Sequence, residues 1–85
     1  MTASEVHPIS TASIEIGSVY EHYKKQRYRV LALARHSETQ EECVVYQALY
    51  GDKGIWVRSV AMFLEPVLVD GRLQPRFRQI MVHEE

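Results

Sequence analysis

The sequence has one cysteine, no long apolar run and no close pair of cysteine or histidine residues. Because Cys43 is the only cysteine among 85 residues, no intrachain disulfide can form. The apolar runs are much shorter than the roughly 20 residues that a membrane-spanning helix needs. A structural zinc site takes four ligands and usually includes a close cysteine or histidine pair. These absences exclude a disulfide scaffold and a helical membrane protein, and we expect no bound metal and no cofactor.

The opening residues, MTASEVHPIS, lack the basic segment and apolar core of a secretory signal. We therefore expect a cytoplasmic protein that does not associate with a membrane. The formal net charge is −1, which favours neither a polyanion-binding protein nor a strongly acidic one.

The length and composition predict one small globular domain. Hydrophobic residues make up 46% of the chain and charged residues 25%, as in average soluble domains. Residues 1–16 show no sustained periodicity, and we predict that they form a flexible N-terminal arm. Residues 17–82 form the predicted domain, and residues 83–85 a frayed tail.

Short segments rich in β-branched and aromatic residues follow one another along the domain. They are VYEHY, YRVLALARH, ECVVYQALY and IWVRS, separated by the polar loops KKQR and SETQ and by the Gly51–Gly54 turn. In SVAMFLEP, Ser59 can cap a single helical turn with Val60, Phe63 and Leu64 pointing inward.

The end of the chain predicts further β structure. Pro66 stops the helical turn from growing, Asp70-Gly71 is a two-residue hairpin signal, and Phe77–Val82 can add a last strand. This order of elements predicts an all-β protein, a small antiparallel SH3-like barrel with one short helical turn before the last strands. A more open β-meander is the alternative.

The register around the Gly51–Gly54 turn decides which rings lie in the core. If Tyr50 lies opposite Ile55, one face is the core face, and the other is apolar but combines small side chains with one large ring and two polar groups. The predicted core face carries Val44, Tyr46, Ala48, Tyr50, Ile55 and Val57, with Leu31 and Leu33 from the preceding strand. The opposite face carries Cys43, Val45, Gln47, Leu49, Trp56 and Arg58, with Ala32 and Ala34 from the neighbouring strand. A one-residue change of register exchanges the two faces.

Trp56 has two interpretations in this register. It is either a half-buried ring packed on Leu49 or the wall of a shallow groove with an alanine floor and with Gln47 and Arg58 as hydrogen-bonding groups. The groove makes the chain a non-enzymatic binding module for an unknown protein or peptide partner. Its predicted ligand-binding residues are Trp56, Arg58, Gln47, Tyr23 and Tyr28. Self-association through an uncovered strand edge fits the same residues, so we expect a monomer or a weak homo-oligomer.

Single-stranded nucleic-acid binding is the alternative function. The segment HYKKQRYR interleaves aromatic rings with cations, a composition that can stack bases and hold phosphates. The cations that carry this alternative are Lys24, Lys25, Arg27 and Arg29.

A metal-dependent enzyme is the third and weakest hypothesis. It depends on His22, His36 and Glu38, which are too few for a recognisable site. Cys43 follows the anionic Glu42, whereas a reactive thiolate needs a cationic neighbour or a helix N-terminus. We therefore assign no catalytic residues and no metal ligands.

The strings HYK, ARHSET, VVYQALYG and WVR, followed by MF, DG and PRF, resemble the small bacterial proteins of the domain of unknown function 1653 family. The similarity runs from about Gly17 to Phe77. The family commonly has glycine after HYK and proline after WVR, where this chain has Lys25 and Ser59. The resemblance implies a short bacterial domain of the predicted fold class, with no established activity, cofactor or catalytic residues to transfer.

Overall fold

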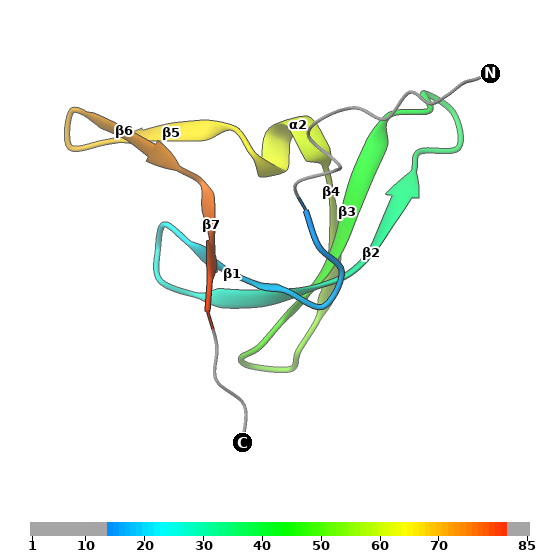
Figure 1. Ribbon diagram of the computed structural model, residues 1–85, viewed down its shortest axis with the longest axis horizontal. Helices are drawn as coiled ribbons and strands as arrows, with labels where there is room; N and C mark the ends of the chain where they lie inside the picture. Colours follow the sequence, from blue (N-terminus) through cyan, green and yellow to red (C-terminus); the bar gives the residue numbers. More distant parts are fainter. Residues whose placement is uncertain (1–13, 82–85) are drawn as a thin grey trace.

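The chain forms short strands and one helical turn, which a computed structural model describes for residues 14–81 (Figure 1). In chain order the elements are β1 (Val19–His22), β2 (Arg27–Arg35), β3 (Glu42–Ala48), β4 (Ile55–Ser59), α2 (Val60–Phe63), β5 (Pro66–Val69), β6 (Arg72–Pro75) and β7 (Phe77–Ile80). Residues 1–13 of the predicted arm (residues 1–16), Val82 at the predicted end of the domain, and the predicted tail (residues 83–85) lie outside the described part. No helix within residues 14–81 combines the length and apolar character needed to cross a membrane.

Five of the strands form one antiparallel sheet in the order β4-β3-β2-β1-β7, and β5 and β6 form a separate hairpin. The predicted all-β class is therefore confirmed. The predicted barrel is not closed, because β4 and β7 do not pair with each other within residues 14–81. The chain between them runs through α2 and through the β5–β6 hairpin, which projects away from the sheet at the left of Figure 1.

Local sequence signals at the second half of the domain are confirmed. The hydroxyl of Ser59 accepts a hydrogen bond from the Met62 N–H (3.1 Å), which caps α2. Asp70 and Gly71 both have positive φ angles, 52° and 79°, as a tight two-residue hairpin turn requires. Leu64 is an exception, since it follows the last helical residue and is exposed rather than inward-pointing.

A β-bulge in β2 changes which of its side chains face the core. Val30 pairs with Tyr46 and Ala32 pairs with Val45, so Leu31 is an extra residue with no partner in β3. We predicted Leu31 on the core face, and the structure places Val30 there, almost fully buried. Side-chain direction therefore reverses along the strand at Leu31.

The β3–β4 pairing differs by three residues from the predicted register. Tyr46 lies opposite Trp56 and Gln47 lies opposite Ile55, because the turn between the strands is longer than the four residues that we predicted. Within this turn the Lys53 N–H donates to the Tyr50 carbonyl (3.0 Å).

A register shift by an odd number of residues exchanges the two faces of β4 relative to those of β3. Trp56 and Arg58 lie on the face of Tyr46, whereas Ile55 and Val57 lie on the opposite face and are largely exposed. The assignment of Ile55, Val57 and the exposed Tyr50 to the core is therefore wrong.

The core is built from side chains of the concave side of the sheet and of α2. Its buried members are Ile14, Tyr20, Val30, Val44, Tyr46, Val60, Phe63 and Phe77, with Tyr28 and Leu33 packed against them. The rings of Phe63 and Phe77 stack with centroids 4.2 Å apart, and Phe63 has no exposed surface. Ile14, which we placed in the arm, is buried in this core.

Replacement of Phe63 by alanine tests the importance of this stack. Phe63→Ala leaves a cavity against Phe77 and Tyr20, so we expect the free energy of unfolding to fall by about 3–5 kcal/mol. Leu68→Ala, at a largely exposed position of the β5–β6 hairpin, should change it by about 0.5 kcal/mol or less. Chemical denaturation of both variants measures the difference, and equal losses would contradict this account of the core.

Candidate functional site

An open pocket of about 210 Å³ lies where the aromatic core reaches the surface of the sheet. Most of its lining comes from strands of the five-stranded sheet, and one ring comes from the β3–β4 turn. The lining residues are His22, Tyr28, Tyr46, Tyr50, Trp56, Arg58 and Phe77. We call this site the aromatic pocket.

Tyr28 occupies the centre of the ring cluster beneath the aromatic pocket. Its ring centroid lies 5.3 Å from that of Tyr46, 5.6 Å from that of Tyr50 and 5.7 Å from that of Phe77, and all three contacts are edge-to-face. The hydroxyls of Tyr28 and Tyr50 share a hydrogen bond of 2.7 Å. Burial, and then this hydrogen bond, raises the pKa of Tyr28, so the phenol stays neutral at physiological pH.

Arg58 supplies the positive charge of the pocket. Its Nε donates to the Tyr46 hydroxyl at 3.3 Å, and the side chain is partly buried. Ion pairs with glutamate are formed by four other arginines of the described chain, namely Arg27, Arg35, Arg76 and Arg78. Within residues 14–81 no carboxylate pairs with Arg58, so its terminal N–H groups can bind an anion.

His22 adds a neutral hydrogen-bond donor. Burial lowers the pKa of His22, and the positive charges of Arg76, Lys24 and Arg58 lower it further. Its Nδ1 accepts the Lys24 backbone N–H at 3.2 Å, so the hydrogen of the neutral ring is on Nε2. The pocket thus combines apolar rings, neutral hydroxyl and imidazole groups and one guanidinium.

The structure brings three of the five predicted binding residues together. Trp56, Arg58 and Tyr28 all line the aromatic pocket. Tyr23 instead lies beside His22, with ring centroids 4.5 Å apart, and lines a separate small hollow. Gln47 is on the other face of the sheet, where its Nε2 donates to the Lys53 carbonyl (3.0 Å).

The predicted groove with an alanine floor does not form. Ala32 and Ala34 pair with Val45 and Cys43, on the face opposite to Trp56. The register shift of β4 separates the tryptophan from that floor, and Trp56 lies opposite Tyr46 instead of Leu49.

Sequence reasoning missed the other walls of the pocket, which are Tyr46, Tyr50 and Phe77, and treated His22 only as a possible metal ligand. Tyr46 was correctly placed on the core face, as its burial shows. The alternation in Trp56-Val57-Arg58 was a usable signal, because it puts the ring and the guanidinium on one side of a strand.

The HYKKQRYR hairpin does not form one stacking surface with its cations. Tyr28 points into the aromatic pocket, while Arg27 pairs with Glu21 (3.7 Å) and Arg29 donates to the Gly17 carbonyl (2.9 Å). Lys24 lies near the Tyr23 ring, with Nζ 5.9 Å from the centroid. Within this hairpin, Lys24 and Tyr23 thus form one cation–π contact, while Tyr28, Arg27 and Arg29 have their contacts elsewhere.

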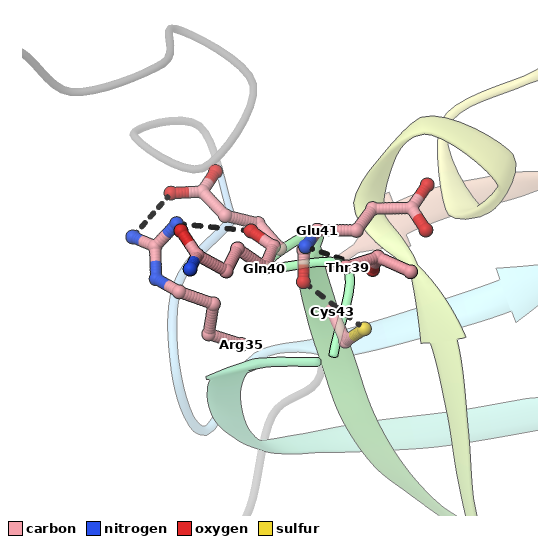
Figure 2. Close-up of polar contacts among 6 residues, drawn as sticks. Arg35, Thr39, Gln40, Glu41 and Cys43 are labelled. Atoms are coloured by element: carbon pink, nitrogen blue, oxygen red, sulfur yellow. Dashed lines mark hydrogen bonds and ion pairs between the residues drawn. The ribbon is translucent and has the colours of Figure 1, made fainter. Parts of the chain in front are cut away.

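The remaining candidate residues, His36, Glu38 and Cys43, lie in or beside the loop between β2 and β3. Their hydrogen bonds stabilise this turn. The Nδ1 of His36 accepts the backbone N–H groups of Glu38 and Thr39 at 3.1 and 3.3 Å. Figure 2 shows the Cys43 thiol donating to the Glu41 carbonyl (3.5 Å) and the Thr39 hydroxyl accepting the Glu41 N–H (3.1 Å). In the described range, no cluster of three or more histidine, cysteine, aspartate or glutamate residues could hold a metal ion.

Comparisons with known proteins find one matching family and a similar solved structure. Residues 18–79 match the model of a family described as a protein of unknown function, DUF1653. The chain belongs to the DUF1653 family. A crystal structure of a DUF1653 protein from Bordetella bronchiseptica is similar to it, with 38% sequence identity and a TM-score of 0.74 over 87% of this chain and 97% of the other. No curated protein matches the sequence.

Membership in DUF1653 supports the sequence resemblance and the all-β fold, and the family description gives no activity. The aromatic pocket differs from the family description in offering specific chemistry, because it combines several rings with the guanidinium of Arg58, which no carboxylate of residues 14–81 pairs with.

The histidine of the pocket should make stability depend on pH. Because the pKa of His22 in the folded state lies below its usual value of 6.5, the unfolded chain binds more protons once the pH falls below that value. The free energy of unfolding should therefore fall from pH 7 to pH 5, and part of this fall should be absent in His22→Gln. Denaturation at several pH values measures it, together with an NMR titration of the His22 ring. An identical pH dependence in the variant, or a pKa above 6.5, would contradict the prediction.

Proposed function

We propose that this protein is a non-enzymatic binding module whose aromatic pocket takes a protein or peptide partner through a carboxylate next to an apolar or aromatic group. The observation that carries the proposal is the partly buried Arg58, which has aromatic neighbours and no carboxylate partner within residues 14–81. Withdrawal of a guanidinium from water without a counter-ion is unfavourable, so an anionic ligand gains affinity at such a position.

The remaining lining supports a ligand with an apolar body. The rings of Tyr50 and Trp56 are accessible at the rim, and Tyr28 and Phe77 form the base. Rigid aromatic side chains are the residues that most often supply binding energy at protein interfaces.

One cation also limits the charge of the ligand. His22 is neutral at physiological pH and the tyrosine hydroxyls are neutral donors, so the pocket suits a single negative charge. A carboxylate, from an acidic side chain or a chain terminus, meets this requirement, and a planar guanidinium can bind it with two parallel hydrogen bonds.

Small probes test the two halves of this ligand. Phenylacetate carries a ring and a carboxylate, and phenylacetamide carries the same ring without the charge. We expect phenylacetate to shift the Trp56 indole N–H and Arg58 Nε–H signals in NMR spectra, and phenylacetamide to bind about tenfold more weakly, since a charge-assisted hydrogen bond is worth about 1.5–3 kcal/mol. Equal affinity of the two probes would remove the role of the charge.

Substitutions locate the binding site. Arg58→Gln should weaken phenylacetate by about tenfold, while Arg72→Gln, an exposed arginine of β6, should leave affinity unchanged. Trp56→Ala should remove most binding yet change the free energy of unfolding by about 1 kcal/mol or less, because the ring is mostly exposed. If Trp56→Ala unfolds the domain, the tryptophan is a core residue and the proposal fails.

Binding of a single-stranded oligonucleotide tests the alternative function. If a labelled single-stranded deoxythymidine 12-mer binds with an affinity that falls steeply with salt and depends on Lys24 and Lys25, the hairpin rather than the aromatic pocket is the binding surface. We expect no such binding, because Arg27 and Arg29 have partners within the domain and Tyr28 lies in the aromatic pocket, which leaves Tyr23 and Lys24 as a small stacking surface.

A further inference from the structure

β4 ends the five-stranded sheet with an unprotected apolar edge. Ile55, Trp56 and Val57 are consecutive and are 60%, 58% and 64% exposed, and no described strand pairs with their outer side. Natural proteins usually protect such edges with charges or proline. The other end strand, β7, follows this rule, because Arg78 and Gln79 occupy its centre.

The pairing of β4 with β3 determines which residues of β4 direct their backbone N–H and C=O groups toward the outer edge. The Ala48 N–H donates to the Gly54 carbonyl (2.9 Å), so residues 54, 56 and 58 direct their backbone groups toward β3. Ile55 and Val57 consequently direct both their N–H and C=O groups outward, and Ser59 directs its N–H outward, while the Ser59 carbonyl accepts the first hydrogen bond of α2 as its N-cap. The backbone groups of Ile55 and Val57 and the N–H of Ser59 are thus available to pair with another strand.

The outward groups and the side chains of β4 are complementary to a second copy of the same strand. If two copies meet antiparallel with Val57 opposite Val57, the two Val57 residues exchange hydrogen bonds and the Ser59 N–H of each copy meets the Ile55 carbonyl of the other. The same register places Trp56 opposite Arg58 of the second copy, twice, on the face of the aromatic pocket. Each guanidinium, which lacks a carboxylate partner within residues 14–81, then lies beside an indole ring.

Neighbouring registers lack this complementarity. Pairing centred on Arg58 puts two like charges opposite each other, and pairing centred on Trp56 brings two indoles together and leaves Arg58 opposite Gly54 of the second copy. A shift of one residue would set Trp56 opposite Val57, whose side chain points to the other face.

We infer that the protein self-associates through the outer edge of β4, in a two-fold antiparallel pairing centred on Val57. This inference goes beyond the proposed binding function and does not depend on it. A guanidinium that stacks on a ring through its flat face keeps its in-plane N–H groups available, so carboxylate binding and pairing are compatible. One short edge strand buries less than a standard interface, so we expect a weak dimer with a Kd on the order of 0.1 mM.

Cysteine cross-linking in the full-length chain tests the register. In a Cys43→Ala background, Val57→Cys should form a disulfide-linked dimer under mild oxidation, because facing residues of a hydrogen-bonded pair lie about 5.5 Å apart at Cα, within disulfide range. Ile55→Cys should not, since the two copies of residue 55 would be about 13 Å apart along the strands. Leu68→Cys, at a similarly exposed position on the β5–β6 hairpin, measures random collision.

Sedimentation equilibrium gives an independent readout. The wild-type chain should approach dimer mass near 1 mM, and Val57→Lys, which sets two cations opposite each other, should stay monomeric, with Leu68→Lys as the matched control. A monomeric wild-type chain at 1 mM, cross-linking of Val57→Cys no faster than Leu68→Cys, or equal cross-linking of Ile55→Cys would overturn the inference. Phenylacetate binding by Val57→Lys should be unchanged, so loss of pairing and loss of the aromatic pocket are separate results.

Discussion

The stack of Phe63 on Phe77 packs the helical turn after β4 against the strand at the far end of the sheet, beside the hydrogen bonds that join Glu65 to Arg76. Phe63 belongs to the helical turn after β4, Phe77 belongs to β7 at the far end of the sheet, and their rings are almost parallel, with an interplanar angle of 7°. Among the described strands, β4 and β7 end the sheet without pairing with each other, so the strands do not form a continuous ring. In a closed barrel, backbone pairing between the first and last strands holds the two ends of the sheet together. Here aromatic packing on the concave side holds them together and buries the apolar side of the curved sheet.

The same stack determines where the aromatic pocket lies. One side of Phe77 is covered by Phe63, and the ring also makes edge-to-face contacts with His22, Tyr28 and Tyr46, with centroids 4.9, 5.7 and 5.5 Å apart. The base of the pocket is thus continuous with the most buried part of the molecule. A site on such a base needs little reorganisation to bind, and its polar groups are held at fixed positions over an apolar surface.

Local signals in the sequence predicted local structure well, and pairing between strands less well. The serine cap at Ser59 and the Asp70-Gly71 hairpin depend on a few adjacent residues, and both are confirmed. The bulge at Leu31 and the long turn before β4 depend on contacts with other strands, and the alternation of apolar residues does not reveal them.

Each of these two irregularities reverses the direction of the side chains in one strand. We predicted Trp56 on the surface opposite to Tyr46, with Tyr28 in the same binding site, and the structure has both beside Tyr46. Both irregularities reverse a strand relative to β3, so side chains of β2 and β4 move to the same face together. The grouping of Tyr28, Trp56 and Arg58 was therefore correct although the face of Trp56 and Arg58 was wrong. Gln47, on the strand whose faces were assigned correctly, is separated from them for the same reason.

The bulge at Leu31 also decides the charge of the aromatic pocket. Without the bulge, the register of the second half of β2 would continue along the whole strand. Arg29 would then lie opposite Ala48, where Tyr28 lies in the structure. The pocket would then contain two guanidinium groups and one ring fewer, and it would suit a phosphate better than a carboxylate. The ligand preference of this surface therefore depends on the number of residues in β2 as well as on their identity.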